Sequence, residues 1–458
     1  MGGIELDRVV PRDGVSLPHD LLLVLAAVTA AVVAQGGYYL PGRLLTTALV
    51  AFALVLALRR PTGSGTPLSV ACAALAAWAV LRALLGGAVT DALPTVAAVG
   101  CLAATALVAQ RADARQRALC ASVLVGIGVL VAVTGWAAVV WRTPSWSVVA
   151  DGLVRAASTL TYPNAAAALL AALAVLALAL NAANPRSLPL AGAGYALVVG
   201  VGATLSRAGL LALVAGLVAL AIGNGVRPSL RHAGPVGLGA LIALGALTPS
   251  IPVAEQARTG LAVSGLVVGL AVTLGLSRVR PVVRLTAVVV GFAAAGVGAF
   301  LANDLGSLLG DRLSTSSPDR AGATAAALDR VAAHPWVGVG PGNGWFDFSR
   351  PTGGSRVMRY VHDEYLQVLV ELGAIGLGLV LLVLAAAAVA VRRGRGGSTW
   401  AGAVAALVVL LVHSGFDFLW HLPVIVVTAG LLIALASPLP AAPAPAAAAD
   451  VPTAEEPS

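Results

Sequence analysis

The sequence has few charged residues, few cysteines and no lysine. Only 10% of its 458 residues are charged, whereas about a quarter are charged in soluble domains. Hydrophobic residues make up 59% of the chain, and long apolar runs recur from end to end. One water-exposed domain cannot bury so much apolar surface, so lipid must cover much of it. The composition therefore excludes an ordinary soluble domain and predicts an all-α polytopic membrane protein.

The scarcity of cysteine limits the covalent and metal chemistry of the chain. Cys72, Cys101 and Cys120 all lie inside apolar runs, without the spacing of a zinc site or a disulfide framework. We interpret them as packing residues. The net charge of +8 comes entirely from arginine, and it indicates nucleic-acid binding only if the arginines form a patch.

Fourteen apolar segments approach the ~20 residues that a membrane-spanning helix needs, and we expect 12 to 14 spans. They are 20–36, 43–58, 68–86, 93–110, 118–140, 163–181, 189–205, 209–223, 235–249, 261–277, 284–302, 364–391, 399–415 and 422–437. The segments 209–223 and 235–249 are short and carry the weakest signal.

The arginines predict the orientation of these spans, because basic residues collect in short cytoplasmic connections. With the N-terminus inside, the inner connections hold arginines 59, 60, 111, 115, 117, 186, 227, 231, 278, 280, 284, 392, 393 and 395. The short outer connections hold only arginines 43, 142, 155, 207 and 258. Both termini are therefore expected in the cytoplasm, and the basic charge mainly sets orientation.

This topology divides the chain into five parts. Residues 1–19 form a cytoplasmic arm without a cleavable signal pattern, and 20–302 form eleven spans. Residues 303–363 form a long outer loop, 364–437 form three more spans, and 438–458 form a Pro/Ala-rich tail expected to be disordered. In the outer loop, Ser317 before Pro318 predicts a helix start. The turn "GVGPGNG" lacks the Lys-Ser/Thr ending of a phosphate loop, so we interpret it as structural.

The segment "RYVHDEYLQVLVELG" places polar residues at the outer start of an apolar run. On a helix, Asp363, Gln367 and Glu371 form one stripe, with Glu364 alongside. An ionisable group near mid-bilayer costs about 2.5–3.5 kcal/mol, so the stripe should face protein or a wet cavity. His362 would lie at the mouth of that cavity. The simpler alternative is an interfacial histidine followed by a capping carboxylate.

Two arginines and two polar turns extend this pattern. Arg207 interrupts an apolar stretch and Arg320 lies in the outer loop; a guanidinium there can grip an anion, or merely snorkel to the interface. Asn164 opens the sixth span in "TYPNAAAALLAAL", and Asp417 lies in the turn "VHSGFDFLWHLP". We expect both to line the cavity. His413, Asp417 and His421 could in principle bind a metal, but their spacing matches no strong zinc signature.

These motifs, taken in order, resemble those of the O-antigen ligase and O-antigen polymerase superfamily of envelope glycosyltransferases. The resemblance rests on "SRAGLLALVAG", "DRAGATAAALDRVAAHPWVGVGPGNGWF" and "HDEYLQVLVELGAIG", with "TYPNAAAALLAAL" and "HSGFDF" as accompaniments. It covers roughly residues 160 to 435. A common family form has asparagine after the histidine, where this chain has Asp363, so the base remains open between the histidine and a neighbouring carboxylate.

The resemblance implies transfer of a glycan from a polyprenyl diphosphate to a hydroxyl of a glycan, lipid or protein acceptor. The reaction would take place at the outer face of the cytoplasmic membrane. Arg207 and Arg320 match diphosphate-binding positions, and His362, with Asp363 and Glu364 beside it, matches the catalytic segment. No metal, cofactor or nucleic acid is implied. The motifs do not distinguish a ligase from a polymerase.

Three other classes share the hydropathy pattern. A flippase or other transporter of lipid-linked sugars also carries buried charge, but this chain shows no convincing internal repeat. A peptidoglycan polymerase shares the architecture without these ordered motifs. A membrane scaffold would not need the arginines together with the histidine.

Overall fold

The computed structural model describes residues 16–59, 67–301, 318–349 and 355–440. Fourteen helices fall on the fourteen expected spans. They are α1 His19–Val33, α2 Leu40–Leu58, α3 Pro67–Leu85, α4 Leu93–Gln110, α5 Ala114–Val140, α6 Pro163–Ala183, α7 Leu188–Ala203, α8 Arg207–Asn224, α9 Val226–Leu247, α10 Thr259–Arg278, α11 Pro281–Leu301, α14 Glu364–Arg393, α15 Gly397–Ser414 and α16 Pro423–Ala436.

Length and composition confirm the all-α polytopic class. Ten helices in the described part of the chain are long and apolar enough to cross a membrane. Four more apolar helices are shorter, and they include α1, α7 and α16. Most of the expected N-terminal arm and of the expected disordered tail lies outside the described residues.

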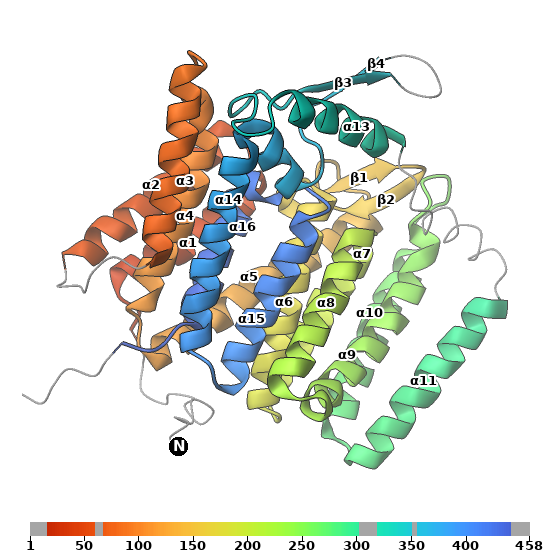
Figure 1. The fold of residues 1–458 in the computed structure, drawn as a ribbon. Coiled ribbons are helices and arrows are strands. Elements are labelled where there is room, and N and C mark those ends of the chain that lie inside the picture. The colour runs from red at the N-terminus through yellow and green to blue at the C-terminus, as the bar shows by residue number, and fades with distance from the viewer. Residues whose placement is uncertain (1–15, 60–66, 302–317, 350–354, 441–458) are drawn as a thin grey trace, which may run out of the picture.

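Helix α6 forms the centre of the bundle. It packs against α5, α7, α8, α9 and α15, and it lies behind α15 in Figure 1. Almost every residue from Pro163 to Asn181 is buried. Its sequence is mostly alanine and leucine, and small alanines let neighbouring helices approach closely. Because α6 is apolar on all sides, only its ends can carry polar groups into the interior.

Two β-hairpins and one helix from the connections cover one end of the bundle, at the top of Figure 1. The hairpin of β1 (Ser147–Ala150) and β2 (Leu153–Ala156) pairs Ser147 with Ala156. Helix α13 (Pro318–Ala333) and the hairpin of β3 (Phe346–Ser349) and β4 (Ser355–Met358) lie above α14. The expected helix start at Pro318 is therefore observed, whereas Ser317 lies outside the described residues.

A small apolar core holds this cap onto the bundle. It joins Ala323 and Ala327 of α13 with Phe346, Val361 and Val370. Burying Phe346 and its aliphatic neighbours stabilises the packing by roughly 1.5–3 kcal/mol per large side chain. The segment leading into α14 is thereby fixed against α13.

Helix α14 is broken at Gly373, which has φ 68° and ψ −172°. This backbone conformation is essentially restricted to glycine. The break leaves backbone groups without helical partners, and hydrocarbon would penalise them strongly. The glycine-rich segment before β3 satisfies them: Val339 N–H donates to Val370 O and Gly340 N–H to Glu371 O, both at 2.9 Å.

The same segment accepts hydrogen bonds from the other side of the break. Ala374 N–H donates to Pro335 O at 2.9 Å, and Ile375 N–H donates to Trp336 O at 3.2 Å. The indole of Trp78 in α3 donates to Leu372 O at 3.0 Å. Backbone hydrogen bonds from residues 335–340, which include part of the turn interpreted as structural, thus join the two halves of α14 across the break.

Candidate functional site

A histidine–aspartate pair lies at the covered end of the bundle, where α14 begins. His362 Nδ1 is 3.0 Å from Asp417 Oδ1 in the turn between α15 and α16. The His362 side chain is 20% exposed and that of Asp417 is fully buried. His362 itself has φ 60°, a left-handed conformation that costs a non-glycine residue about 1–3 kcal/mol. The chain is thus strained where it presents the imidazole.

Asp417 accepts hydrogen bonds from several directions. The Tyr162 hydroxyl donates at 2.6 Å, and Asn164 Nδ2 donates to Oδ2 at 2.5 Å. The backbone N–H of Phe418 donates to Oδ1 at 2.9 Å. Tyr162 and Asn164 belong to the start of α6, so the central helix helps to hold the carboxylate. The buried charge is therefore well solvated by protein donors.

These donors determine the protonation of the pair. Burial alone would raise the pKa of Asp417, but the hydrogen bond and charge of His362, then Tyr162 and Asn164, hold it at about 2. An ionised carboxylate can only accept, so Nδ1 of His362 carries a proton. In the neutral form of the imidazole, Nε2 is then the proton acceptor. Burial and the charge of Asp417 raise the pKa of Tyr162 well above its usual range, so this hydroxyl stays protonated.

Two arginines, Arg155 and Arg320, interact with residues that hold this pair. Arg155 of β2 donates from Nε to Thr204 O at 2.9 Å and from a terminal nitrogen to Asn164 Oδ1 at 3.0 Å. Arg207 is the exposed first residue of α8, after the N-cap Ser206. The positive end of a helix dipole therefore adds to the Arg207 charge.

Arg320 reaches the same site from the cap. It lies in the first turn of α13 and is half-buried. Its charge opposes, as a smaller influence, the rise in the pKa of Tyr162. The guanidinium therefore lies close enough to act on the phenol. Arginine forks at the edge of a partly dry site are suited to phosphate recognition.

A second histidine–carboxylate pair lies beside the first. His421 Nδ1 is 3.3 Å from Glu364 Oε1, and the backbone N–H of Trp420 also donates to Glu364. Burial would lower the pKa of His421, but Glu364 raises it above its usual value. The Tyr360 ring lies between the pairs, with centroids 4.4 Å from His421 and 4.5 Å from Phe418. Both pairs tie the start of α14 to the α15–α16 turn.

The polar residues expected to form one stripe on α14 fall into two groups with different surroundings. Asp363 is the N-cap, and its carboxylate accepts from the backbone of Tyr365 and Leu366. Gln367 Nε2 donates to Glu371 Oε1 at 2.6 Å, and both side chains are buried. Asp363 thus faces the helix end, while Gln367 and Glu371 face inward.

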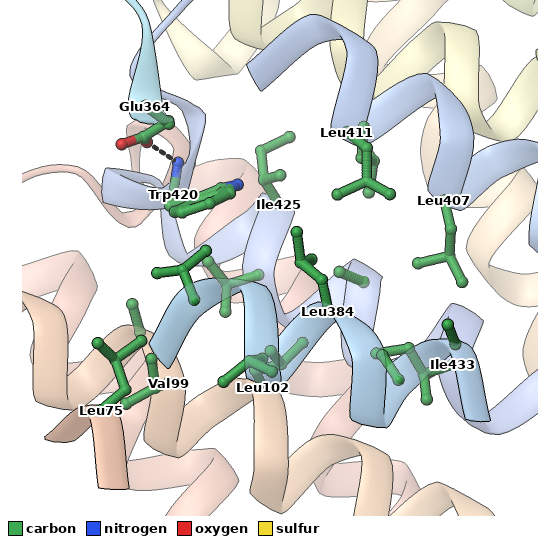
Figure 2. Close-up of a pocket in the computed structure, with 18 of the residues that line it drawn as sticks. Leu75, Val99, Leu102, Glu364, Leu384, Leu407, Leu411, Trp420, Ile425 and Ile433 are labelled. Atoms are coloured by element: carbon green, nitrogen blue, oxygen red, sulfur yellow. Dashed lines mark hydrogen bonds between the residues drawn. The ribbon is translucent and has the colours of Figure 1, made fainter. Parts of the chain in front are cut away.

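The inward-facing groups open onto an apolar groove of about 630 Å³. Its polar end, which we name the groove mouth, is lined by Glu364, Gln367, Glu371, Trp420 and His421. The rest of the groove is lined mainly by aliphatic side chains of α3, α4, α14, α15 and α16. Figure 2 shows Glu364 bonded to Trp420 at one end, with Leu384, Leu407 and Ile425 directed into the space. Among the described residues, no three His, Cys, Asp or Glu side chains gather as metal ligands would.

The structure brings together His362, Asn164 and Asp417 by hydrogen bonds, with Arg320 close by. Glu364, Gln367 and Glu371 lie instead at the groove mouth. In the sequence, Arg155 was only one of the few arginines expected in short outer connections, and it was not predicted to belong to a site. No local signal identifies that arginine, because its partners come from α6 and the α7–α8 turn.

These features define the class: a polytopic helical membrane protein with a polar site at one end of its bundle. The O-antigen ligase family model matches residues 243–381, from α9 into α14. The match confirms the resemblance over this segment and supports membership in the O-antigen ligase family. It includes Arg320 and His362. The family implies a glycosyltransferase-like ligase or polymerase of polysaccharide biosynthesis. No curated protein matches the sequence.

Proposed function

We propose that the protein transfers a glycan from a polyprenyl diphosphate to an acceptor hydroxyl at the outer face of the cytoplasmic membrane. The observation that carries this proposal is the His362–Asp417 pair, 3.0 Å apart, with Arg155 bonded at 3.0 Å to Asn164, which itself holds Asp417. A base oriented by a buried carboxylate and a cationic rim are the two things that such a transfer needs.

In this mechanism, Nε2 of His362 takes the proton of the acceptor hydroxyl. The hydroxyl oxygen forms a bond to the anomeric carbon of the donor glycan, and the bond from that carbon to the diphosphate breaks. The electron pair leaves with the diphosphate, whose growing charge Arg207 and Arg320 stabilise. Asp417 remains ionised and stabilises the imidazolium, as in other carboxylate-oriented histidine bases.

The neighbouring carboxylates are occupied elsewhere. Asp363 accepts two backbone hydrogen bonds of the helix start, at 3.0 and 3.1 Å. Glu364 is paired with His421 and the backbone of Trp420. Because these contacts hold both acids, we assign the base to the histidine, which Asp417 orients, and a supporting role to these acids.

The test is glycan transfer in proteoliposomes that contain a polyprenyl-diphosphate glycan and an acceptor, without nucleotide sugar. His362→Ala should lose about 10²–10⁴-fold in rate, the usual contribution of a general base. His334→Ala is the matched control, because His334 is an exposed histidine of the same cap. Normal transfer by His362→Ala would remove the assignment. Lipid-linked glycan crossing the bilayer without transfer would favour the transporter.

Lysine substitutions separate diphosphate binding from anchoring at the interface. Removing one electrostatic contact of a transition state costs about 10²–10³-fold in rate, and lysine cannot reproduce the arginine fork. Arg207→Lys and Arg320→Lys should therefore recover only part of the activity that alanine variants lose. Full activity of both lysine variants would instead indicate snorkelling arginines, because lysine snorkels equally well.

A further inference from the structure

A cluster of basic side chains lies at the end of the bundle away from the cap, where α9 and α11 begin. The chain just after α9 reaches the covered end, because Val154 N–H of the hairpin donates to Ile251 O at 2.8 Å. The start of α9 therefore lies at the opposite end. There Arg231 is exposed, whereas His232 and Arg284 are only 7% and 6% exposed. Basic residues that only set orientation belong to exposed connections and need no burial.

Helix packing places Arg231 beside Arg284. The chain returns through α10, so α9 and α11 run in the same direction (Figure 1). A Cβ on Gly234 of α9 would lie 3.2 Å from Val288 of α11. One helical turn before this contact come Arg231 on α9 and Arg284 on α11. The charge of Arg231 acts on Arg284, and both charges act on His232.

The described helices around this cluster supply no carboxylate to offset its charge. The helices that pack against α9 include α6, α7, α8, α10 and α11, and none of these contains Asp or Glu. Between residues 152 and 303 the sequence has one acid, Glu255, which follows the covered end of α9. Arginines 186, 227, 278 and 280 add further positive charge at the same end. Like charges on facing helices repel, and an anion between them would remove that cost.

The two guanidinium groups have donors to offer such an anion. Arg284 Nε donates to Leu276 O at 2.8 Å, and one terminal nitrogen donates to Ser277 O and Val279 O. These bonds cap the end of α10 and account for part of Arg284 only. The described residues supply no acceptor to its other terminal nitrogen or to Arg231. A phosphate group accepts such forked donors especially well.

The surroundings favour the phosphate of a lipid over a soluble one. Leu230 adjoins Arg231, and Val283 and Leu285 flank Arg284; all three aliphatic side chains are more than half exposed. On membrane-spanning helices such side chains face hydrocarbon, so acyl chains can pack beside them while the phosphate lies at the arginines. A soluble anion or polyanion would gain nothing from these residues. A zwitterionic headgroup would add a cation to a cluster that is already basic.

We propose that the phosphate of an anionic phospholipid binds between Arg231 and Arg284 and links the start of α9 to the start of α11. The topology predicted from the arginines places this end at the cytoplasmic leaflet, where basic pockets between helices bind anionic headgroups. Because the site exists only where the two helices meet, the bound lipid stabilises the folded chain by mass action.

The test is photolabelling of the full-length protein in phosphatidylcholine liposomes. The probe is phosphatidylglycerol with a diazirine in one acyl chain, and labelled peptides of α9 and α11 are mapped by mass spectrometry. Labelling should fall about tenfold in Arg231→Gln, equivalent to ~1.4 kcal/mol. Arg231→Lys should retain part of it, because lysine keeps the charge without the fork. Arg393→Gln is the matched control: it removes an exposed arginine from the last turn of α14, at the same end of the bundle, and should leave labelling unchanged.

Competition identifies the source of the phosphate. Unlabelled phosphatidylglycerol should displace the probe, whereas phosphatidylcholine at the same mole fraction and inorganic phosphate at the same concentration should not. Displacement by inorganic phosphate would assign the cluster to a soluble anion, and displacement by phosphatidylcholine would show general lipid contact. Either result would overturn the proposal. Equal labelling of Arg231→Gln and wild type would show that the arginines serve orientation alone.

Thermal unfolding gives a second readout of the same site. Phosphatidylglycerol in the liposomes should raise the melting temperature of the wild type and of Arg393→Gln to the same extent. The rise should be smaller in Arg231→Gln, which has lost one of the two groups that hold the phosphate. An equal rise in all three proteins would refute the link between α9 and α11.

Discussion

Replacing Asp417 with asparagine tests the central pair of the site. In the wild type, one carboxylate accepts from His362, Tyr162, Asn164 and the backbone of Phe418. Asparagine keeps one acceptor oxygen and turns the other into an NH₂ donor. If the oxygen stays toward His362 and Phe418, the new NH₂ meets the NH₂ of Asn164. Two donors then face each other in a buried site.

The expected cost follows from these contacts. Asn164 could relieve the conflict by turning its amide, but its Oδ1 already accepts from Arg155 at 3.0 Å. Either arrangement leaves one buried polar group without a partner, which costs about 1–3 kcal/mol of stability. Loss of the negative charge also removes the support for the imidazolium. We therefore expect Asp417→Asn to lose about 10²–10⁴-fold in rate, close to the value for His362→Ala.

The assay is initial-rate glycan transfer in proteoliposomes, with thermal unfolding measured on the same sample. The pKa of Asp417 is about 2 against an ordinary 3.8. Its stabilising contribution is therefore complete above pH ~4 and lost only as pH falls toward 2. The stability loss caused by Asp417→Asn should consequently be the same from about pH 5 to pH 8. A rate within threefold of wild type, in a folded variant, would refute the orienting role of the carboxylate.

Further predictions concern topology, the broken helix and pH. A membrane-impermeant maleimide applied from outside should modify Asp347→Cys and spare Arg393→Cys; the reverse labelling would place the site in the wrong compartment. Gly373→Ala should lower the melting temperature through at least ~1 kcal/mol of strain, because its Cβ would overlap the backbone of Trp336 and Val337. Gly378→Ala, whose added Cβ meets nothing within 4 Å, should be neutral or stabilising by about 0.5–1 kcal/mol. Equal losses of stability in the two variants would contradict the bridging of the α14 break by residues 335–340. Because the pKa of His421 is raised, its ion pair with Glu364 stabilises the fold below pH ~6.5, and this stabilisation is lost as pH rises through the raised pKa. The melting temperature of His421→Gln should therefore depend less on pH than that of the wild type.

Hydropathy alone was sufficient to predict the helices. The bilayer fixes the length of an apolar helix, so runs of about 20 residues locate spans without knowledge of their neighbours. The segment 93–110 was predicted with the bounds of α4, and 364–391 ends two residues before α14. The polar residues that interrupt outer ends of spans, among them His362 and Asn164, were visible for the same reason.

The partners of those residues were decided by tertiary structure. His362 and Asp417 are 55 residues apart, and Arg155 contacts Thr204 at a separation of 49. Helical periodicity identifies neighbours within one helix only. The order of helices in the bundle is not encoded by hydropathy when a helix such as α6 is apolar on every side.

The break in α14 and the groove beside it also required the folded chain. Gly373 lies near the start of a long apolar run, where glycine is common in membrane helices. The carbonyls and amides of residues 335–340 that meet its neighbours make an open backbone tolerable there. The sequence by itself thus determined which polar residues lie at the ends of the spans. The packing of α3, α4, α15 and α16 around α14 decided that Asp417 faces His362, whereas Glu364 and Glu371 face an apolar groove.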